Sequence, residues 1–180
     1  MKRIFSLLLI LSFLKEADAQ KMYTTSTGQV KLKSISKVEN LIAENNKAES
    51  RWLENNGQIF FSFLMKDFLF EHSNADYDFI ESFTENAKYP KVELKGFIQD
   101  IQLIDLTNSG GNEISIEGTI TIHGVAKKIL VNGNLTVLSS GKIMLKTDLR
   151  IKLKDFQIVT KEKSPKTDQE NVFSIFCIYE

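Results

Sequence analysis

The chain is short of the residues that build disulfides, metal centres and catalytic dyads. Its 180 residues include one cysteine (Cys177), two histidines (His72 and His123) and two prolines. A single thiol cannot form an internal disulfide, so the stability of the fold must come from packing and hydrogen bonds. Neither histidine has a second nitrogen or sulfur ligand at a metal-binding spacing. We therefore expect no metal and no cofactor, and we expect Cys177 to be a small buried hydrophobic residue.

The sequence also lacks an excess of charge of either sign. It carries 23 basic and 23 acidic side chains, without an Arg-rich stripe. Such a chain has no electrostatic footprint for nucleic acid or for an anionic membrane surface, so neither is expected as a partner. An apolar content of 42% argues against general disorder, and the length suits one domain with its own core.

Long hydrophobic runs are missing, apart from a short one near the N-terminus. Lys2 and Arg3 precede an apolar run over residues 4–14. This pattern predicts a secretory signal peptide that is cleaved after Ala19. As a helix the run spans only about 16 Å, roughly half the hydrocarbon thickness of a bilayer, which argues against a stable membrane anchor. We expect a mature domain of residues 20–180 that is periplasmic or secreted.

Apolar residues at every second position dominate the rest of the chain. This is the period of a half-buried β-strand, because successive side chains of a strand point to opposite faces. The spacing suits a meander of antiparallel strands, but alternation alone fits a sandwich as well as a barrel. We therefore predict an all-β fold, with strands in the stretches 30–33, 59–65, 92–98, 114–122, 129–137, 143–153 and 172–178.

One segment between the second and third of these stretches has a helical period instead. We expect a short helix there, capped by Ser73 or Asn74 and stopped at Tyr89-Pro90, because the residue before a proline is disfavoured in a helix. Its apolar stripe is formed by Phe79, Ile80, Phe83 and Ala87.

Two segments together resemble the paired signature of the YceI-like family: KYPKVELKG at residues 88–96 and GTITIHGV at residues 118–125. Members of that family are secreted, lipocalin-like β-barrels, and characterised members hold an extended polyisoprenoid in the barrel. The resemblance therefore implies a lipocalin-like barrel of eight antiparallel strands with one short helix, and lipid binding in place of catalysis. The chain departs from the family pattern at Gln157, where relatives usually have glycine.

The inward faces of the predicted strands supply the candidate binding residues. Phenylalanine is abundant, with thirteen in the chain, and suits either a lipid-accepting tunnel or a barrel filled by its own side chains. Both readings use the same residues. The candidate tunnel lining consists of Ile59, Phe61, Phe63, Met65, Val92, Leu94, Ile98, Ile120, Ile122 and Leu149, and the candidate mouth of Tyr77, Phe79, Phe83 and Tyr89.

The free energy gained by burying apolar groups restricts which ligand such a tunnel can bind. Each buried CH₂ group contributes roughly 0.8 kcal/mol, so one isoprene unit contributes at most ~4 kcal/mol, whereas association costs about 4 to 15 kcal/mol. A single unit would not bind. The expected partner is therefore a long isoprenoid or a similar apolar lipid.

Catalysis has little support in the sequence, and no catalytic residue is predicted. His123 lies in the Ile-His-Gly-Val segment and is expected to be a turn residue, while Asp76, Asp78, Glu81 and Glu85 suit a solvated helix face. The chain has no Gly-x-Ser-x-Gly elbow. Two alternatives to a lipid carrier stay open. One is a structural or stress-related envelope module with a solid core that acts through its surface, and the other is a small hydrolase or isomerase with a polar pair inside the barrel.

Overall fold

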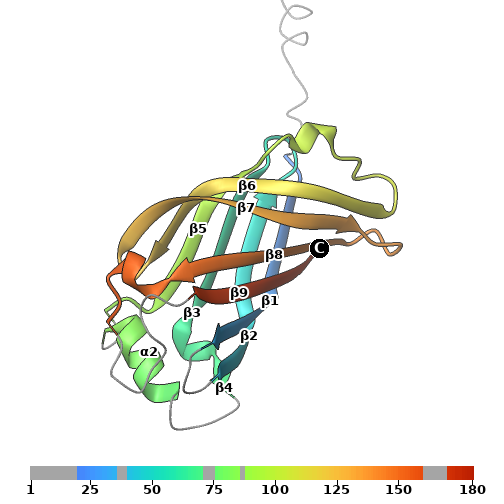
Figure 1. The fold of residues 1–180 in the computed structure, drawn as a ribbon. Helices are drawn as coiled ribbons and strands as arrows, with labels where there is room; N and C mark the ends of the chain where they lie inside the picture. Colours follow the sequence, from blue (N-terminus) through green and yellow to red (C-terminus); the bar gives the residue numbers. More distant parts are fainter. Residues whose placement is uncertain (1–19, 36–39, 71–75, 86–87, 160–169) are drawn as a thin grey trace, which may run out of the picture.

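The residues that the structure describes form nine antiparallel strands, one short α-helix and three 3₁₀ turns (Figure 1). The computed structural model describes residues 20–35, 40–70, 76–85, 88–159 and 170–180, with only the backbone described at 35, 40, 41 and 76–79. The strands are β1 (Met22–Ile35), β2 (Asn40–Leu53), β3 (Gln58–Leu64), β4 (Leu69–Phe70), β5 (Lys91–Ile98), β6 (Gly110–Ile122), β7 (Val125–Val137), β8 (Ile143–Lys152) and β9 (Glu170–Tyr179), and the helix is α2 (Asp76–Thr84).

The sheet closes on itself through β1. The strands lie in the order β1-β9-β8-β7-β6-β5-β3-β2, and β1 pairs with both β9 and β2. The result is a closed eight-stranded barrel, and the two-residue strand β4 pairs with β2 as an extra strand. The predicted lipocalin-like, all-β barrel is therefore confirmed, as is the short helix between strands, which lies at one end of the barrel (Figure 1).

A bulge in β1 allows this strand to serve two neighbours. The register of β1 with β2 shifts on either side of Gly28. A Cβ atom at this position would lie 3.0 Å from the Ala48 carbonyl oxygen and 3.0 Å from the Cys177 sulfur. Glycine therefore lets β1 approach β2 and β9 at the point where the barrel closes.

Several predicted boundaries differ from the observed ones. Most of the strands begin earlier than predicted, in particular β1 at Met22, β6 at Gly110 and β7 at Val125. β3 ends at Leu64 and β8 at Lys152, so Met65 and Leu153 belong to the 3₁₀ turns η1 (Met65–Asp67) and η3 (Leu153–Phe156) that follow these strands. Helix α2 is shorter than predicted and ends where Glu85 takes a positive φ of 45°. The predicted caps Ser73 and Asn74, and Ala87 of the stripe, lie outside the described residues.

The turn between β6 and β7 contains only His123 and Gly124. Both have positive φ, 51° and 73°, as expected for the tight two-residue turn that matches the twist of a hairpin. A Cβ atom on Gly124 would lie 2.6 Å from Cε1 of Tyr89, so the glycine also makes room for that ring. The prediction that His123 is a turn residue is confirmed.

Gln157 ends the η3 turn in the left-handed conformation, with φ 59° and ψ 25°. Its backbone N–H donates to the Lys154 carbonyl over 3.2 Å. This region of φ,ψ space is costly for a residue with a Cβ atom. Glycine would suit this conformation better than glutamine, so the turn carries strain in the present chain.

Replacing Gln157 by glycine should raise the free energy of unfolding by about 1 kcal/mol, because glycine adopts the left-handed conformation without the steric cost. Urea unfolding followed by tryptophan fluorescence measures the change. Lys154→Gly is the matched control, since Lys154 lies in the same turn outside the left-handed region and glycine there should destabilise. If the Gln157→Gly protein is no more stable than the parent, the turn is not strained at Gln157.

Candidate functional site

The barrel interior brings the ten predicted lining residues together. Each is at most 7% exposed, and all belong to one continuous hydrophobic cluster. Strand register explains why they meet. Leu94 of β5 pairs with Phe61 of β3 on one side and with Ile120 of β6 on the other. Val92 pairs in the same way with Phe63, so alternate residues of three adjacent strands face one interior.

A small apolar cavity lies within this interior. Its volume is about 20 Å³, enough for little more than one water-sized sphere. A chain of several isoprene units therefore fits only if side chains repack or strands move apart. Six predicted residues line the cavity, together with five that sequence reasoning did not select: Ile59, Phe61, Val92, Leu94, Ile120 and Leu149, and then Ile116, Val131, Leu145, Thr147 and Ile175.

Phenylalanine rings fill the end of the barrel next to α2. Phe63 lies 5.6 Å from Phe68 and 5.5 Å from Phe173 between ring centroids, and Phe83 of α2 lies 6.3 Å from Phe173. Aromatic pairs at these distances attract one another beyond their buried area. We call these four residues the phenylalanine plug. The predicted mouth residue Phe83 thus closes this end, since only 1% of its surface is exposed.

The other predicted mouth residues are placed differently. Tyr89 is half-buried, and its ring packs edge-on against His123, with 4.5 Å between the ring centroids. It thus lies against the β6–β7 turn. Tyr77 and Phe79 belong to the part of α2 whose side chains are not described, so their role stays a prediction.

A second aromatic cluster fills the opposite end of the barrel. Trp52 stacks on Tyr23 at 4.4 Å and meets Tyr179 edge-on at 6.3 Å. Trp52 and Tyr179 are fully buried, and Tyr23 is 6% exposed. We call these three residues the tryptophan plug. Sequence reasoning did not single it out, although a lone tryptophan next to a run of polar residues was a signal available for it.

Two polar groups lie within the tryptophan plug. The Tyr179 hydroxyl lies 2.8 Å from the Ser50 hydroxyl, which donates to the Phe60 carbonyl. The Trp52 Nε1–H group is buried and finds no acceptor among the described residues. An unpaired buried donor of this kind costs about 1–3 kcal/mol.

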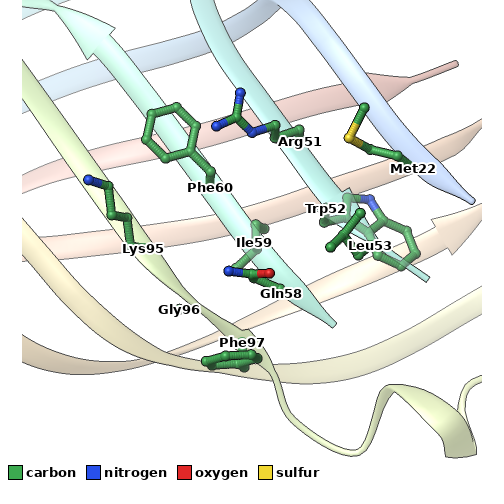
Figure 2. Close-up of a pocket in the computed structure, with 10 residues that line it drawn as sticks. All are labelled: Met22, Arg51, Trp52, Leu53, Gln58, Ile59, Phe60, Lys95, Gly96 and Phe97. Carbon is green, nitrogen blue, oxygen red and sulfur yellow. The ribbon is translucent and has the colours of Figure 1, made fainter. Parts of the chain in front are cut away.

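A separate depression of about 470 Å³ lies on the outer face of β2, β3 and β5 (Figure 2). Phe60 stands between two cations there: the Arg51 guanidinium lies 4.8 Å and the Lys95 ammonium 6.0 Å from the ring centroid. The rest of the depression includes the exposed side chains of Met22 and Phe97. An amphipathic anion would suit this chemistry. The depression is separate from the interior cavity, with which it shares only one lining residue, Ile59.

The described residues offer little for catalysis. No group of three or more His, Cys, Asp or Glu side chains among them is placed to hold a metal ion. His123 Nδ1 lies 3.3 Å from the Phe156 carbonyl oxygen, and Nε2 lies 3.8 Å from a Glu85 carboxylate oxygen, both at the β6–β7 turn. Within the described part of the chain, no helix has the length and apolar character needed to cross a bilayer.

Burial changes the ionisation of two groups on β9. It raises the pKa of the Cys177 thiol to about 12 and the pKa of the Tyr179 phenol well above its ordinary value, because the charged forms lose their hydration. Cys177 is fully buried, as predicted for a small hydrophobic residue. Both groups are therefore neutral in the folded protein at pH values where they ionise in the unfolded chain.

The free energy of unfolding should fall as the pH rises from about 9 to 12, because the unfolded chain loses protons that the folded chain keeps. Each group contributes up to about 1.4 kcal/mol per pH unit within its window. Urea unfolding at pH 8 and at pH 10.5 measures the loss. Cys177→Ala should lose less stability than the parent over this interval, whereas equal losses would show that the thiol does not contribute.

Phe63→Asp should lower the free energy of unfolding by at least about 3 kcal/mol, because it buries an unpaired carboxylate among phenylalanine rings. Thermal unfolding measures the effect. Phe60→Asp is the matched control on the same strand: its side chain faces outward beside Arg51 and Lys95, so a much smaller change is expected. Normal stability of Phe63→Asp would mean that the two faces of β3 are assigned backwards.

A closed antiparallel barrel around an apolar interior defines this protein as lipocalin-like in fold. The chain belongs to the YceI-like family, because the model of the YceI-like domain matches residues 12–174. The match begins within the predicted signal peptide, so the boundary at Ala19 and the domain of residues 20–180 stay predictions. A search of curated proteins found no match.

Solved structures share the fold at low sequence identity. A polyisoprenoid binding domain from Saccharophagus degradans, implicated in plant cell wall breakdown, is 14% identical with a TM-score of 0.71, over 89% of this chain and 98% of that one. Burkholderia cenocepacia BcnA is 15% identical with a TM-score of 0.64, over 85% and 96% of the two chains. The Campylobacter jejuni YCEI protein is 18% identical with a TM-score of 0.55, over 81% and 87%.

Proposed function

We propose that this protein binds a long apolar chain, of the isoprenoid class, inside its barrel and acts as a carrier and not as an enzyme. The observation that carries the proposal is the wall of hydrophobic side chains that eight strands direct into one closed interior. The structural relative from Saccharophagus degradans is described as a polyisoprenoid binding domain, which supports the same class of ligand. We expect little preference among head groups, because most of the side chains that face the interior are apolar.

The length of the ligand follows from the energy balance. Roughly 4 kcal/mol per buried isoprene unit must exceed an association cost of about 4 to 15 kcal/mol. In this barrel the ligand must in addition displace packed side chains, because the cavity present measures only about 20 Å³. A chain of several units satisfies both requirements, whereas a single unit satisfies neither.

We propose further that the protein is exported. The support is the charged and apolar pattern of the first nineteen residues, which lie outside the described part of the structure. Without that segment the chain carries 20 basic and 21 acidic side chains, so its surface is nearly neutral overall. A neutral carrier in the periplasm or outside the cell would exchange ligand with membranes by apolar contact, not by charge attraction.

A second function is favoured by the packed interior itself. If the barrel stays solid, the protein acts through its outer surface, as a structural or stress-related module of the envelope. The depression around Phe60, with Arg51 and Lys95 on either side, is then the first place to look for a partner.

Mass spectrometry of an organic extract separates the two functions. The protein is purified without detergent from a periplasmic or secreted fraction, and the extract is compared with that of Phe63→Asp and of an unrelated exported barrel. A polyisoprenoid or quinone at close to stoichiometric amount is the expected result. An extract with nothing above background, from protein that also fails to take up added polyisoprenoid, would contradict the carrier function and favour the surface module.

A further inference from the structure

The ladder between β7 and β8 covers only part of the length of these strands. β7 pairs with β6 over thirteen residue pairs and β8 pairs with β9 over ten. In contrast, β7 and β8 pair with each other over only five, from Gly133 with Thr147 to Val137 with Ile143. Beyond Gly133 the two strands diverge (Figure 1). We call the facing stretches without a shared ladder, residues 125–132 of β7 and 148–152 of β8, the β7–β8 seam.

Apolar side chains face this seam from both strands. Ile129 and Val131 lie opposite Gly118 and Ile116 of β6, which places them on the inward side of β7. Both nevertheless keep part of their surface exposed, unlike the fully enclosed residues of the neighbouring strands. This partial exposure is expected where the neighbouring strand is not hydrogen bonded to β7.

The interior cavity reaches the seam. Val131 of β7 and Leu149 of β8 both line the cavity, and so does Thr147 at the point where the strands separate. The Thr147 hydroxyl donates to the Asn132 carbonyl over 2.8 Å and closes one end of the seam. At the other end Lys127 reaches Asp155 at 4.0 Å and lies 5.6 Å from the Phe156 ring centroid.

The two ends of the barrel are less accessible. The phenylalanine plug fills the end at α2, and the tryptophan plug fills the opposite end. Passage through either end requires several buried rings to leave their packing. The β2–β3 ladder is also short, with four pairs, but it covers more than half of the seven residues of β3. Eight of the thirteen residues of β7 and half of the ten residues of β8 share no ladder with each other, so separating the strands along this stretch breaks no backbone hydrogen bond of a ladder.

We infer that an apolar chain enters and leaves the barrel sideways through the β7–β8 seam, by separation of β7 from β8, and not through an end of the barrel. The inference rests on the proposed binding of such a chain. Because the cavity is almost full in the closed barrel, side chains must repack or strands must move apart for the chain to enter, and β7 and β8 share no ladder along this seam.

A reversible disulfide across the seam, here called a clasp, tests the inference. Asn132 and Asp148 occupy the next positions of the β7–β8 register after Gly133 and Thr147, and both are exposed. The double variant Asn132→Cys, Asp148→Cys joins the strands when oxidised and releases them when reduced. Cys177 is fully buried, so it does not compete for the new disulfide. Thiol titration shows that the disulfide has formed.

The probe is all-trans-retinol, a fluorescent isoprenoid alcohol, mixed with the full protein in a stopped-flow fluorimeter. Oxidation should slow loading by at least about tenfold, and reduction should restore the parent rate, as for a lid that gates access. The control clasp Thr119→Cys, Lys128→Cys joins residues of β6 and β7 that are already paired and should leave the rate unchanged. Equal loading rates of the oxidised and reduced Asn132→Cys, Asp148→Cys variant would overturn the inference.

A second pair of variants tests the seam without a disulfide. Ile129→Trp places a large ring in the seam and should slow loading several-fold, while Leu130→Trp, on the outward face of the same strand, should not. Equal rates for the two would also overturn the inference. If the parent protein takes up no retinol and no longer polyisoprenoid, the proposed function itself fails. If uptake is normal but neither the disulfide nor Ile129→Trp slows it, only the route through the seam is rejected and the proposed function stands.

Discussion

Closure of the sheet through β1 is the constraint on which the rest of the structure depends. Because β1 is hydrogen bonded to β2 on one side and to β9 on the other, the barrel has no free edge along this strand. Every inward side chain must then share one interior. The bulge at Gly28 eases the closure, since a Cβ atom there would lie only 3.0 Å from the Ala48 carbonyl oxygen and from the Cys177 sulfur.

The same closure leads to a tension between packing and binding. Eight strands enclose a space that is just wide enough to be filled by side chains or to hold one small ligand. Here the two plugs and the aliphatic walls leave a cavity of about 20 Å³, so ligand binding and solid packing compete for the same volume. A seam with few backbone hydrogen bonds resolves the tension, because it lets the wall yield in one place while the other ladders hold the fold.

Alternation of apolar residues was enough to predict the barrel strands with strongly hydrophobic inward faces, but not β2. Its inward residues include Ala43, Asn45, Ala48 and Ser50, which are small or polar and give no apolar alternation, so its place follows only from pairing with β1 and β3. The wall residues were also predictable, because burial follows from strand period. The sequence could not show whether these residues enclose a tunnel or fill a core, since the free volume of the interior depends on how rings such as Phe173 pack in three dimensions. The seam was equally hidden, because an unpaired stretch such as residues 148–152 of β8 alternates in the same way as a paired one.

Methyl NMR of isotopically labelled isoleucine, with a long polyisoprenoid added in steps, tests the central claim most directly. If the chain enters the barrel, the methyl signals of Ile59, Ile120 and Ile175, which line the interior cavity, should shift in proportion to the chain bound. The signals of Ile42 and Ile178, which are 37% and 38% exposed, should stay in place. Shifts confined to these exposed residues, or no shifts despite binding, would contradict the account and place the ligand on the outer surface.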